Sequence, residues 1–343
     1  MGYRMPLRTR DFDYHLPDEL IAARPLAERS ASRMLVVHRD SGVIEHRMFR
    51  EFPGFLQAED LLVLNDTKVI PARVFADDGK IELLCLERIS PVEWRCLVRP
   101  GKRLRAGRAL TVGGILGTVA EVCSNGDRLI RWAAPLDLNQ HGHLALPHYM
   151  GRTDELADRE RYQTVFAREE GAIAAPTAGL HFTSEMLESL PHALLTLHVG
   201  VGTFRPVSAE VVAEHVMHAE KFALSAATAR RVNAARRVVA VGTTVTRVLE
   251  ALGAGTANSG SARGDRSLKI EETDHTGATD IFIYPPYDFR VVGGLLTNFH
   301  LPQSTLIMLV SALAGRDLIL EAYRQAVAER YRFYSYGDCM LVV

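Results

Sequence analysis

The chain has 343 residues, about two domains' worth on a prior of roughly 150 residues per domain, which is enough to bury a core without disulfides. Hydrophobic residues make up 47% and charged residues 24% of it, and these ordinary globular values exclude wholesale disorder. Forty basic and 41 acidic side chains give a formal net charge of -1, so a nucleic-acid partner would need a local basic patch.

The sequence indicates neither export nor membrane insertion. Its first ten residues hold no apolar stretch of the secretory kind, and the longest apolar run, residues 306–314, is shorter than the ~20 residues of a membrane span. The four cysteines contain no C-x-x-C pair. We therefore expect a cytoplasmic protein with reduced thiols, no membrane segment and no bound metal.

The first 68 residues predict the start of an α/β body. Residues 17–23 predict a short helix and residues 34–38 a strand. Residues 60–64 form an apolar run that predicts a buried strand, and the polar sequence Asn65-Asp66-Thr67-Lys68 follows it directly.

Residues 69–148 follow a different pattern. Short alternating runs, such as residues 94–98 and 117–122, are bounded by Gly, Pro, Asp or Asn, which predicts a small all-β sandwich or barrel. Within it, residues 99–108 carry five cations and no acid. This segment predicts a phosphate-binding stripe, although a solvated basic turn explains it equally well.

After residue 149 the alternation of strands and helices returns. Helices are predicted at residues 183–190, 226–237, 243–252, 303–314 and 317–330, and strands at residues 194–199, 238–241, 280–284 and 295–299. The fold class is therefore a mixed α/β main domain, residues 1–68 and 149–343, with a small inserted all-β barrel domain, residues 69–148.

Four segments at predicted strand ends are rich in Gly, His, Thr and Asn. They are residues 174–183, 197–206, 215–220 and 297–302. Glycine lets the backbone approach a ligand closely, and histidine is suited to proton transfer near neutral pH. A single histidine at a strand end is more often structural, but the recurrence favours one shared cleft. The spacing of His215, His218 and Glu220 lacks the context of a zinc motif.

The sequence after the predicted strand at residues 238–241 starts with Gly242-Thr243-Thr244 and continues to Arg247. A glycine turn followed by a helix start forms an anion site from free backbone amides, suited to a carboxylate or phosphate. The alternative is an ordinary turn capped by a threonine hydroxyl. Neither G-x-G-x-x-G nor a P-loop lysine is present, so a dinucleotide or ATP site is not indicated.

Taken together, these segments resemble the S-adenosylmethionine:tRNA ribosyltransferase-isomerases of queuosine biosynthesis, the QueA family. The matching segments are residues 61–73, 161–166, 174–183, 196–207, 215–220, 242–244, 295–305 and 331–338. The resemblance implies a mixed α/β domain with a small inserted β-barrel. It also implies that the ribosyl part of S-adenosylmethionine moves onto 7-aminomethyl-7-deazaguanine at the tRNA wobble position, giving epoxyqueuosine, adenine and methionine. The donor is a substrate and no cofactor is expected, and a monomer is one option for the oligomeric state.

Three sets of residues are candidates for this chemistry. Proton transfer is assigned to His181, His198 and His300, without deciding which is the base and which the acid. Substrate binding is assigned to Thr177, Gly179, Gly200, Gly202, Thr203, Gly242, Thr243, Thr244, Arg247 and Asn298, with Tyr284 or Tyr287 facing the sulfonium. The tRNA contacts are assigned to Lys68, Arg99, Lys102, Arg103, Arg105 and Arg108.

The sequence also departs from the family pattern. Gly293 stands where an acidic residue is common, and Pro286 and His148 replace a glycine and a proline. The missing acid removes one candidate carboxylate of the cleft. A catalytically silent tRNA-binding relative therefore stays open as an alternative. An S-adenosylmethionine-dependent methyltransferase is the other, because a strand followed by a glycine turn suits that ligand too.

Overall fold

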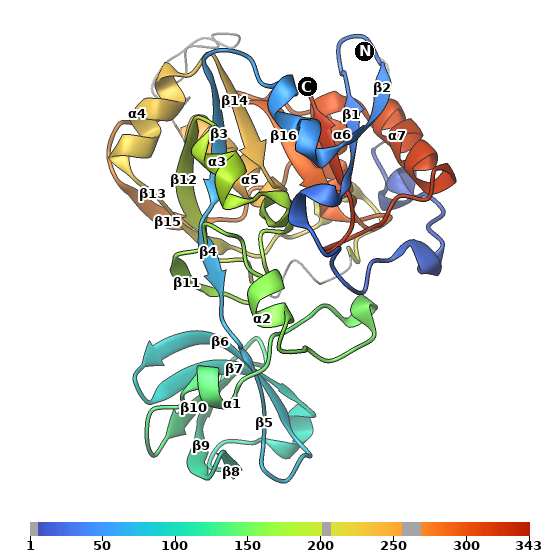
Figure 1. Ribbon diagram of the computed structural model, residues 1–343. Helices are drawn as coiled ribbons and strands as arrows, with labels where there is room; N and C mark the ends of the chain where they lie inside the picture. Colours follow the sequence, from blue (N-terminus) through green and yellow to red (C-terminus); the bar gives the residue numbers. More distant parts are fainter. Residues whose placement is uncertain (1–5, 201–206, 256–268) are drawn as a thin grey trace.

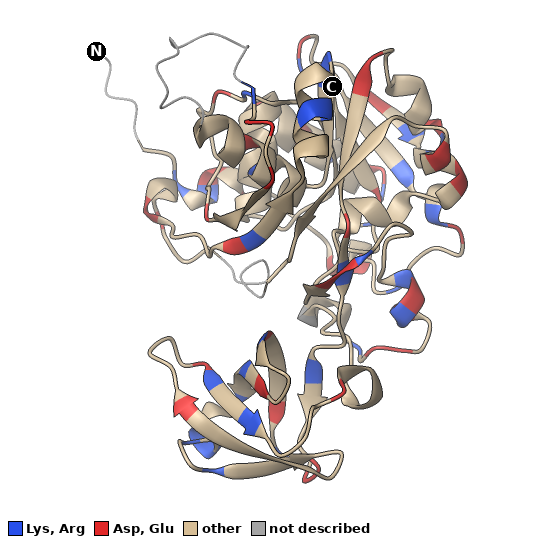
Figure 2. Ribbon diagram, turned by 90° about the vertical axis from the view of Figure 1, so that its left-hand side faces the viewer, with Lys and Arg blue, Asp and Glu red and all other residues tan. Residues whose placement is uncertain are grey.

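The computed structural model describes residues 6–200, 207–255 and 269–343. Two parts are visible in Figure 1: a large α/β body at the top and a small β unit below it. The two strands that run between them, β4 (Thr67–Val69) and β11 (Glu169–Ala172), pair in parallel. Figure 2 shows the same two parts from the side.

The body is built on a nine-stranded sheet. Its order is β15 (His275–Thr279), β13 (Glu220–Leu224), β12 (His192–Leu197), β3 (Asp60–Asn65), β14 (Arg237–Val241), β16 (Val292–Asn298), β17 (Cys339–Val342), β1 (Arg33–Val37) and β2 (Ile44–Met48). The four central strands β12, β3, β14 and β16 are parallel, and antiparallel pairs flank them on both sides. Their carboxyl ends therefore meet at one edge.

Both faces of this sheet are buried. All six residues of β3 are buried, and their side chains alternate between the two faces. Leu61 and Val63 join the core under α4 (Ala226–Ala234), α5 (Thr243–Gly255), α6 (Thr305–Ala314) and α7 (Arg316–Ala328). Leu62 and Leu64 join the opposite core, with Phe49, Phe52 and α3 (Ser184–Glu188). The body is thus a three-layer arrangement with a continuous apolar interior.

The small unit is a six-stranded antiparallel sheet with its own apolar core. Its order is β5 (Arg73–Phe75), β6 (Glu82–Ser90), β7 (Glu93–Arg99), β10 (Arg128–Trp132), β9 (Ile115–Val122) and β8 (Ala109–Val112). The sheet curls, so that the Asp77 amide beyond β5 donates to the Thr111 carbonyl of β8 at 2.8 Å. Cys85 and Cys96 face each other across β6 and β7 as free thiols. The fold class, a mixed α/β body with a small β domain, is confirmed, while the exact domain limits stay a prediction.

Five predicted helices of the body are found within a few residues of the expected positions. The strand predicted at residues 280–284 is wrong: residues 280–290 form no strand, and the edge of the sheet is instead β15, directly before them. Residues 275–279 form the edge strand because they pair with β13, although they are less apolar than residues 280–284. The sequence analysis also missed β17 at the C-terminus, which lies between β16 and β1.

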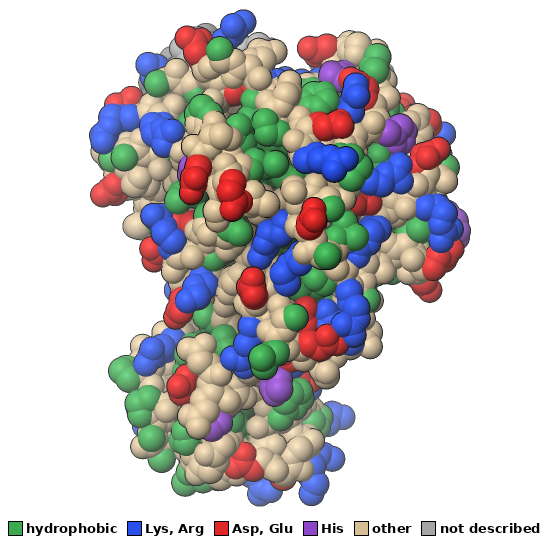
Figure 3. Space-filling view, in the orientation of Figure 1, with side chains coloured by type: hydrophobic (Ala, Val, Ile, Leu, Met, Phe, Trp, Pro, Cys, Tyr) green, Lys and Arg blue, Asp and Glu red, His purple; other side chains and the backbone are tan. Residues whose placement is uncertain are grey.

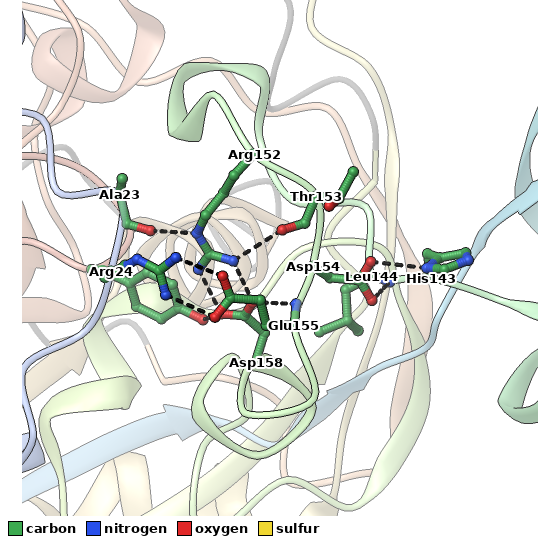
Figure 4. A network of polar contacts seen from close by, with 10 residues as sticks. Ala23, Arg24, His143, Leu144, Arg152, Thr153, Asp154, Glu155 and Asp158 are labelled. Carbon is green, nitrogen blue, oxygen red and sulfur yellow. Dashed lines mark hydrogen bonds and ion pairs between the residues drawn. The ribbon is translucent and has the colours of Figure 1, made fainter.

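The segment that returns from the small unit to the body is held by a dense polar network (Figure 4). It includes α1 (Leu138–His141) and α2 (Asp158–Arg161). The buried carboxylate of Asp158 receives two bonds from Arg152, at 2.5 and 2.8 Å, and one from the Tyr336 hydroxyl at 2.8 Å. Asp154 accepts from the Leu144 amide at 2.9 Å and contacts His143. These bonds fix where the chain re-enters the body.

Within the described part of the chain, no helix has the length and apolar character needed to cross a membrane.

Candidate functional site

The carboxyl ends of the four parallel strands form the chemically richest edge of the body. Strand order reverses there, because β3 connects to β12 on one side and the later strands β14 and β16 lie on the other. Open α/β sheets bind ligands in the crevice at such a reversal. Asn65, Gly242 and Asn298 stand at the ends of β3, β14 and β16, so three of the polar strand ends meet in one place.

A cavity of about 450 Å³ opens at this edge, and we call it the inner cavity. Its walls include Pro147, Tyr149, Tyr162, residues 174–178, Val199, Val207, residues 242–244, residues 297–306, Tyr334 and Ser335. This volume falls in the range of small-molecule sites. The predicted residues Thr177, Gly242, Thr243, Thr244, Asn298 and His300 all line it.

Two helices begin at the wall of the inner cavity. Helix α5 starts at Thr243, directly after Gly242, whose φ of +96° lies in the left-handed region that glycine adopts readily. Helix α6 starts at Thr305, with Ser304 as its N-cap, accepting from the Ile307 amide at 3.3 Å. Helix N-termini carry free amides and partial positive charge, so this wall favours a carboxylate.

Asn298 is fixed by its surroundings on the wall of the inner cavity. Its side-chain amide donates to the carbonyls of Tyr334 at 2.9 Å and Ser335 at 3.3 Å. Its Oδ1 lies 3.1 Å from Nε2 of His181, whose Nδ1 lies 2.7 Å from the Ser32 hydroxyl. A neutral His181 satisfies both contacts by donating to Asn298 and accepting from Ser32.

His181 and His300 are both buried histidines. Burial lowers the pKa of His181 to about 4, and both of its ring nitrogens are in hydrogen bonds. Burial lowers the pKa of His300 to about 3, and its Nε2 lies 2.8 Å from the Thr297 hydroxyl. His300 lines the inner cavity, whereas His181 lies behind Asn298 and does not. Neither ring accepts a proton readily at neutral pH.

A second, larger hollow of about 970 Å³ lies between the body and the small unit, and we call it the interdomain cleft. Residues of β6, β7 and the return segment line one side. Lys68, Gly171, His198, Gly200 and Lys221 are among those on the body side. Figure 3 shows basic and acidic side chains interspersed over the narrow waist between the two parts.

Only a thin wall separates the two hollows. Val199 lines both, and Ile173 on the cleft side is followed by Ala174 on the cavity side. The Ile173 amide donates to the Val199 carbonyl at 3.0 Å, which holds the two segments of the wall together. A group bound in one hollow is therefore close to a group bound in the other.

His198 stands on the cleft side of this wall. Its Nδ1 lies 2.8 Å from the hydroxyl of Thr67, a fully buried residue of β4. Gly171 of β11 has a φ of +151°, and a Cβ there would lie 2.9 Å from the His198 ring. The close packing leaves the ring half-buried, and this lowers its pKa.

Arg247 does not reach the inner cavity. Its guanidinium is buried against Glu220 of β13 and donates to the carbonyls of Ile281 and Thr279 at 3.2 Å each. The other oxygen of Glu220 accepts from the Gly200 amide at 3.0 Å. This ion pair therefore supports the wall between the hollows, and the carboxylate role predicted for Arg247 has no geometric basis.

The remaining predicted residues divide into three groups. Gly179 packs against Phe166 and Thr164 outside the inner cavity, and a Cβ there would lie 2.8 Å from each. Tyr284 packs on Phe282, and the Tyr287 hydroxyl donates to Glu250 at 3.3 Å. Neither tyrosine lines the cavity. Gly202 and Thr203 lie outside the described residues.

Of the six cations assigned to tRNA, Lys68 lies in the interdomain cleft. Arg99, Lys102, Arg103, Arg105 and Arg108 are exposed on the small unit and line no part of the cleft. The cleft has other cations that the sequence did not single out: Arg88, Arg95, Arg159 and Lys221. They come from distant segments, so no local run of charge could reveal them.

Aromatic rings of the inner cavity were also missed. The rings of Tyr149 and Tyr334 pack at a tilt of 39° with centroids 4.4 Å apart, and Tyr162 and Phe299 complete the aromatic wall. The Tyr149 hydroxyl lies 2.6 Å from that of Ser335. Tyr162 and Tyr334 fall within segments that matched the family, which was the available signal.

The sequence model of the queuosine biosynthesis proteins matches residues 9–342 of this chain. The chain belongs to this family.

Two relatives are named S-adenosylmethionine:tRNA ribosyltransferase-isomerase. That of Desulfitobacterium hafniense is 48% identical, over 98% of this chain and all of the relative. That of Solibacter usitatus is 47% identical, over 97% of this chain and 99% of the relative. A crystal structure of S-adenosylmethionine tRNA ribosyltransferase from Thermotoga maritima matches with a TM-score of 0.53 and 38% identity, covering 97% of this chain and 100% of that one.

The departure at Gly293 does not touch the site of this queuosine biosynthesis protein. Gly293 lies near the start of β16, whereas Asn298 ends that strand at the cavity, about 16 Å away at roughly 3.3 Å per residue. A Cβ at residue 293 would meet the side chain of Arg237, which pairs with Asp60. A side chain here would start beside Arg237 and not at the inner cavity, so the absence of an acid removes no group from the cavity lining.

Among the described residues, no group of three or more His, Cys, Asp or Glu side chains is placed to hold a metal ion. His215 packs edge-on against Phe282, and Glu220 is engaged by Arg247.

Proposed function

We propose that this enzyme of queuosine biosynthesis is an S-adenosylmethionine:tRNA ribosyltransferase-isomerase. It transfers and isomerises the ribosyl part of S-adenosylmethionine onto 7-aminomethyl-7-deazaguanine at the wobble position of tRNA. The products are epoxyqueuosine-tRNA, adenine and methionine. The observation that carries the proposal is the shared wall: in a member of this family, a small-molecule cavity and an open charged cleft meet at Val199.

The inner cavity suits the donor. The N-termini of α5 and α6 offer amides to the methionine carboxylate. The rings of Tyr149, Tyr162 and Tyr334 line the same space and suit the sulfonium, since aromatic rings attract cations. Polar groups from Thr177 and Thr244 line the same space for ribose and adenine. The donor is a substrate in this proposal, and no further cofactor takes part.

The interdomain cleft suits an anticodon loop. Single-stranded loop bases can be splayed out and bound while cations contact the phosphates. The cleft is open, and its cations come from both the body and the small unit, so a loop entering it would touch both. The proposal includes a cytoplasmic site of action and a monomeric enzyme, which light scattering can test.

One incubation distinguishes the proposal from its alternatives. The protein is mixed with S-adenosylmethionine and tRNA that carries the aminomethyl precursor, and the wobble nucleoside is analysed by mass spectrometry. Epoxyqueuosine with stoichiometric adenine supports the proposal. S-adenosylhomocysteine would instead indicate a methyltransferase, and tRNA binding without adenine release would indicate a silent relative. Unmodified guanine at the wobble position is the control substrate.

A further inference from the structure

We propose that His198, held by Thr67, is the base that removes the proton from the attacking amine of the modified nucleobase. This inference rests on the proposed function, and it assigns one role that the sequence left open among His181, His198 and His300. Three observations on the shared wall carry it: the position of the ring, the bond that orients it, and the space made for it.

The position of His198 matches the path of the reaction. The ring lines the interdomain cleft, and the next residue, Val199, lines both the cleft and the inner cavity. An aminomethyl group entering from the cleft must pass this wall to reach a ribosyl carbon in the cavity. His181 is not on that path, because it lies behind Asn298.

The bond to Thr67 fixes which nitrogen is used. The Thr67 hydroxyl lies 2.8 Å from Nδ1 of His198 and 3.4 Å from the carbonyl of Glu169. If the hydroxyl donates to that carbonyl, its oxygen accepts from Nδ1–H, and Nε2 carries the free lone pair. A threonine side chain with 0% exposure serves here as the orienting group.

The backbone opposite makes room for the ring. Gly171 adopts a φ of +151°, which L side chains rarely adopt, and a Cβ would approach the imidazole to 2.9 Å. Glycine is therefore required here for two reasons, conformation and space. The His198 amide, donating to the Lys221 carbonyl at 3.1 Å, fixes the backbone from the other side.

The protonation of His198 depends on charged side chains from the neighbouring strands β3, β4, β11 and β13. Asp66 after β3 and Glu169 of β11 favour the protonated ring, whereas Lys221 of β13 and burial disfavour it. Lys68 of β4 and Glu220 of β13 also line this part of the cleft, paired with Glu170 and Arg247. The net effect lowers the pKa of His198, which keeps the ring neutral near pH 7 with one nitrogen lone pair free, while the ring is only half-buried, unlike those of His181 and His300.

The proposed step is a single proton transfer. The aminomethyl ammonium of the nucleobase gives one proton to Nε2 of His198, whose lone pair forms the new N–H bond. The amine nitrogen keeps the electron pair of the broken bond and uses it to form the bond to the ribosyl carbon. The imidazolium so formed still donates Nδ1–H to Thr67, and it loses its extra proton to water after turnover.

The test is the pH dependence of the single-turnover rate with saturating donor and tRNA. We expect His198→Gln to lower the rate at pH 7 by 10²- to 10⁴-fold, the usual range for a lost general base. The deficit should shrink as pH rises, because solvent then deprotonates the amine. Donor affinity, measured by calorimetry without tRNA, should stay within about threefold of wild type. His275→Gln, on the β15 edge, is the matched control and should behave as wild type.

A second pair of variants separates orientation from folding. Thr67→Val removes the hydroxyl at similar volume and should slow the step about tenfold or more, whereas Thr67→Ser keeps the hydroxyl and should restore most of the rate. Added imidazole should partly rescue a His198→Gly variant. Melting curves confirm that each variant is folded before its rate is used.

Three results would overturn the inference: a His198→Gln rate within threefold of wild type, a deficit independent of pH, or equal rates for Thr67→Val and Thr67→Ser. Each would leave the proposed function intact, provided that wild type forms epoxyqueuosine. If wild type forms no epoxyqueuosine on precursor-bearing tRNA, the proposed function itself fails.

Discussion

The inner cavity and the interdomain cleft meet at one wall but differ in physical character. His300 on the inner cavity and His181 behind its wall are buried and hydrogen-bonded, and burial lowers their pKa values to about 3 and about 4. Charged groups at the cleft are paired but largely exposed, as in Lys68–Glu170 and Lys221–Glu87. The inner cavity is thus lined by side chains held in fixed positions, whereas the cleft carries charged side chains at the surface.

This contrast in burial shows that residue type alone does not assign a role to a histidine or a charged residue. The three histidines follow the same kind of Gly- and Thr-rich sequence, yet His181 and His300 are buried, whereas His198 is half-buried and lines the cleft. Variants of residues in the wall, the inner cavity and the cleft test this contrast.

The largest effect is expected in the wall that separates them. Arg247→Met removes the guanidinium that pairs with the buried carboxylate of Glu220, and we expect the free energy of unfolding to fall by about 3–5 kcal/mol, because removing one member of a buried ion pair is strongly destabilising. Chemical denaturation measures it. The double variant Glu220→Gln/Arg247→Met should regain part of the loss. A loss below about 1 kcal/mol for the single variant would show that the wall does not depend on this pair.

The buried histidines predict a stability that depends on pH. Their folded pKa values lie below the ~6.5 of an unfolded histidine, so the unfolded chain binds more protons as pH falls below that value. Their contribution is complete above about pH 6.5 and declines toward pH 4. At pH 5 each should have lost about 2 kcal/mol. Unfolding curves at pH 7.5 and 5.0 test this, and His300→Gln should flatten the difference. An unchanged difference in that variant would contradict the prediction.

The aromatic wall of the inner cavity predicts a smaller effect, confined to the donor. Tyr149→Leu removes a ring that would face the sulfonium, and donor affinity should fall about tenfold, from roughly 1–2 kcal/mol of cation–π attraction in a desolvated site. Calorimetry with S-adenosylmethionine measures it, and sinefungin-like amines serve as cationic comparisons. Phe75→Leu, exposed on the small unit, is the control. Equal affinities for both variants would place the sulfonium elsewhere.

The cleft predicts the smallest change, and one that depends on salt. Lys221→Ala should raise KM for tRNA about threefold and reduce the slope of log K against log salt by about one, as expected for one lost phosphate contact. KM for the donor should not change. Charge reversal of Lys102, Arg103 and Arg105 tests the exposed basic segment in the same assay. An effect in the segment without one at Lys221 would move the tRNA site from the cleft to the outer face of the small unit.

Several strands and helices, part of the inner cavity and the family could be predicted from the sequence alone. Apolar periodicity located β3, β14 and the helices α5, α6 and α7, because these elements are buried along a regular face. Polar residues at strand ends correctly indicated that Gly242, Asn298 and His300 share one cavity, since the carboxyl ends of parallel strands meet at one edge. The long matching segments also indicated the family.

Side-chain partners, edge strands and histidine pKa values could not be predicted from the sequence, because they depend on burial and pairing between residues far apart in the chain. Only the fold shows that Arg247 pairs with Glu220, 27 residues away, and that the ring of Tyr149 packs against that of Tyr334. Edge strands such as β15 are chosen by their ladder partner more than by their own composition. The ionisation of a histidine is set in the same way, by how much water its neighbours exclude, and no local pattern records that.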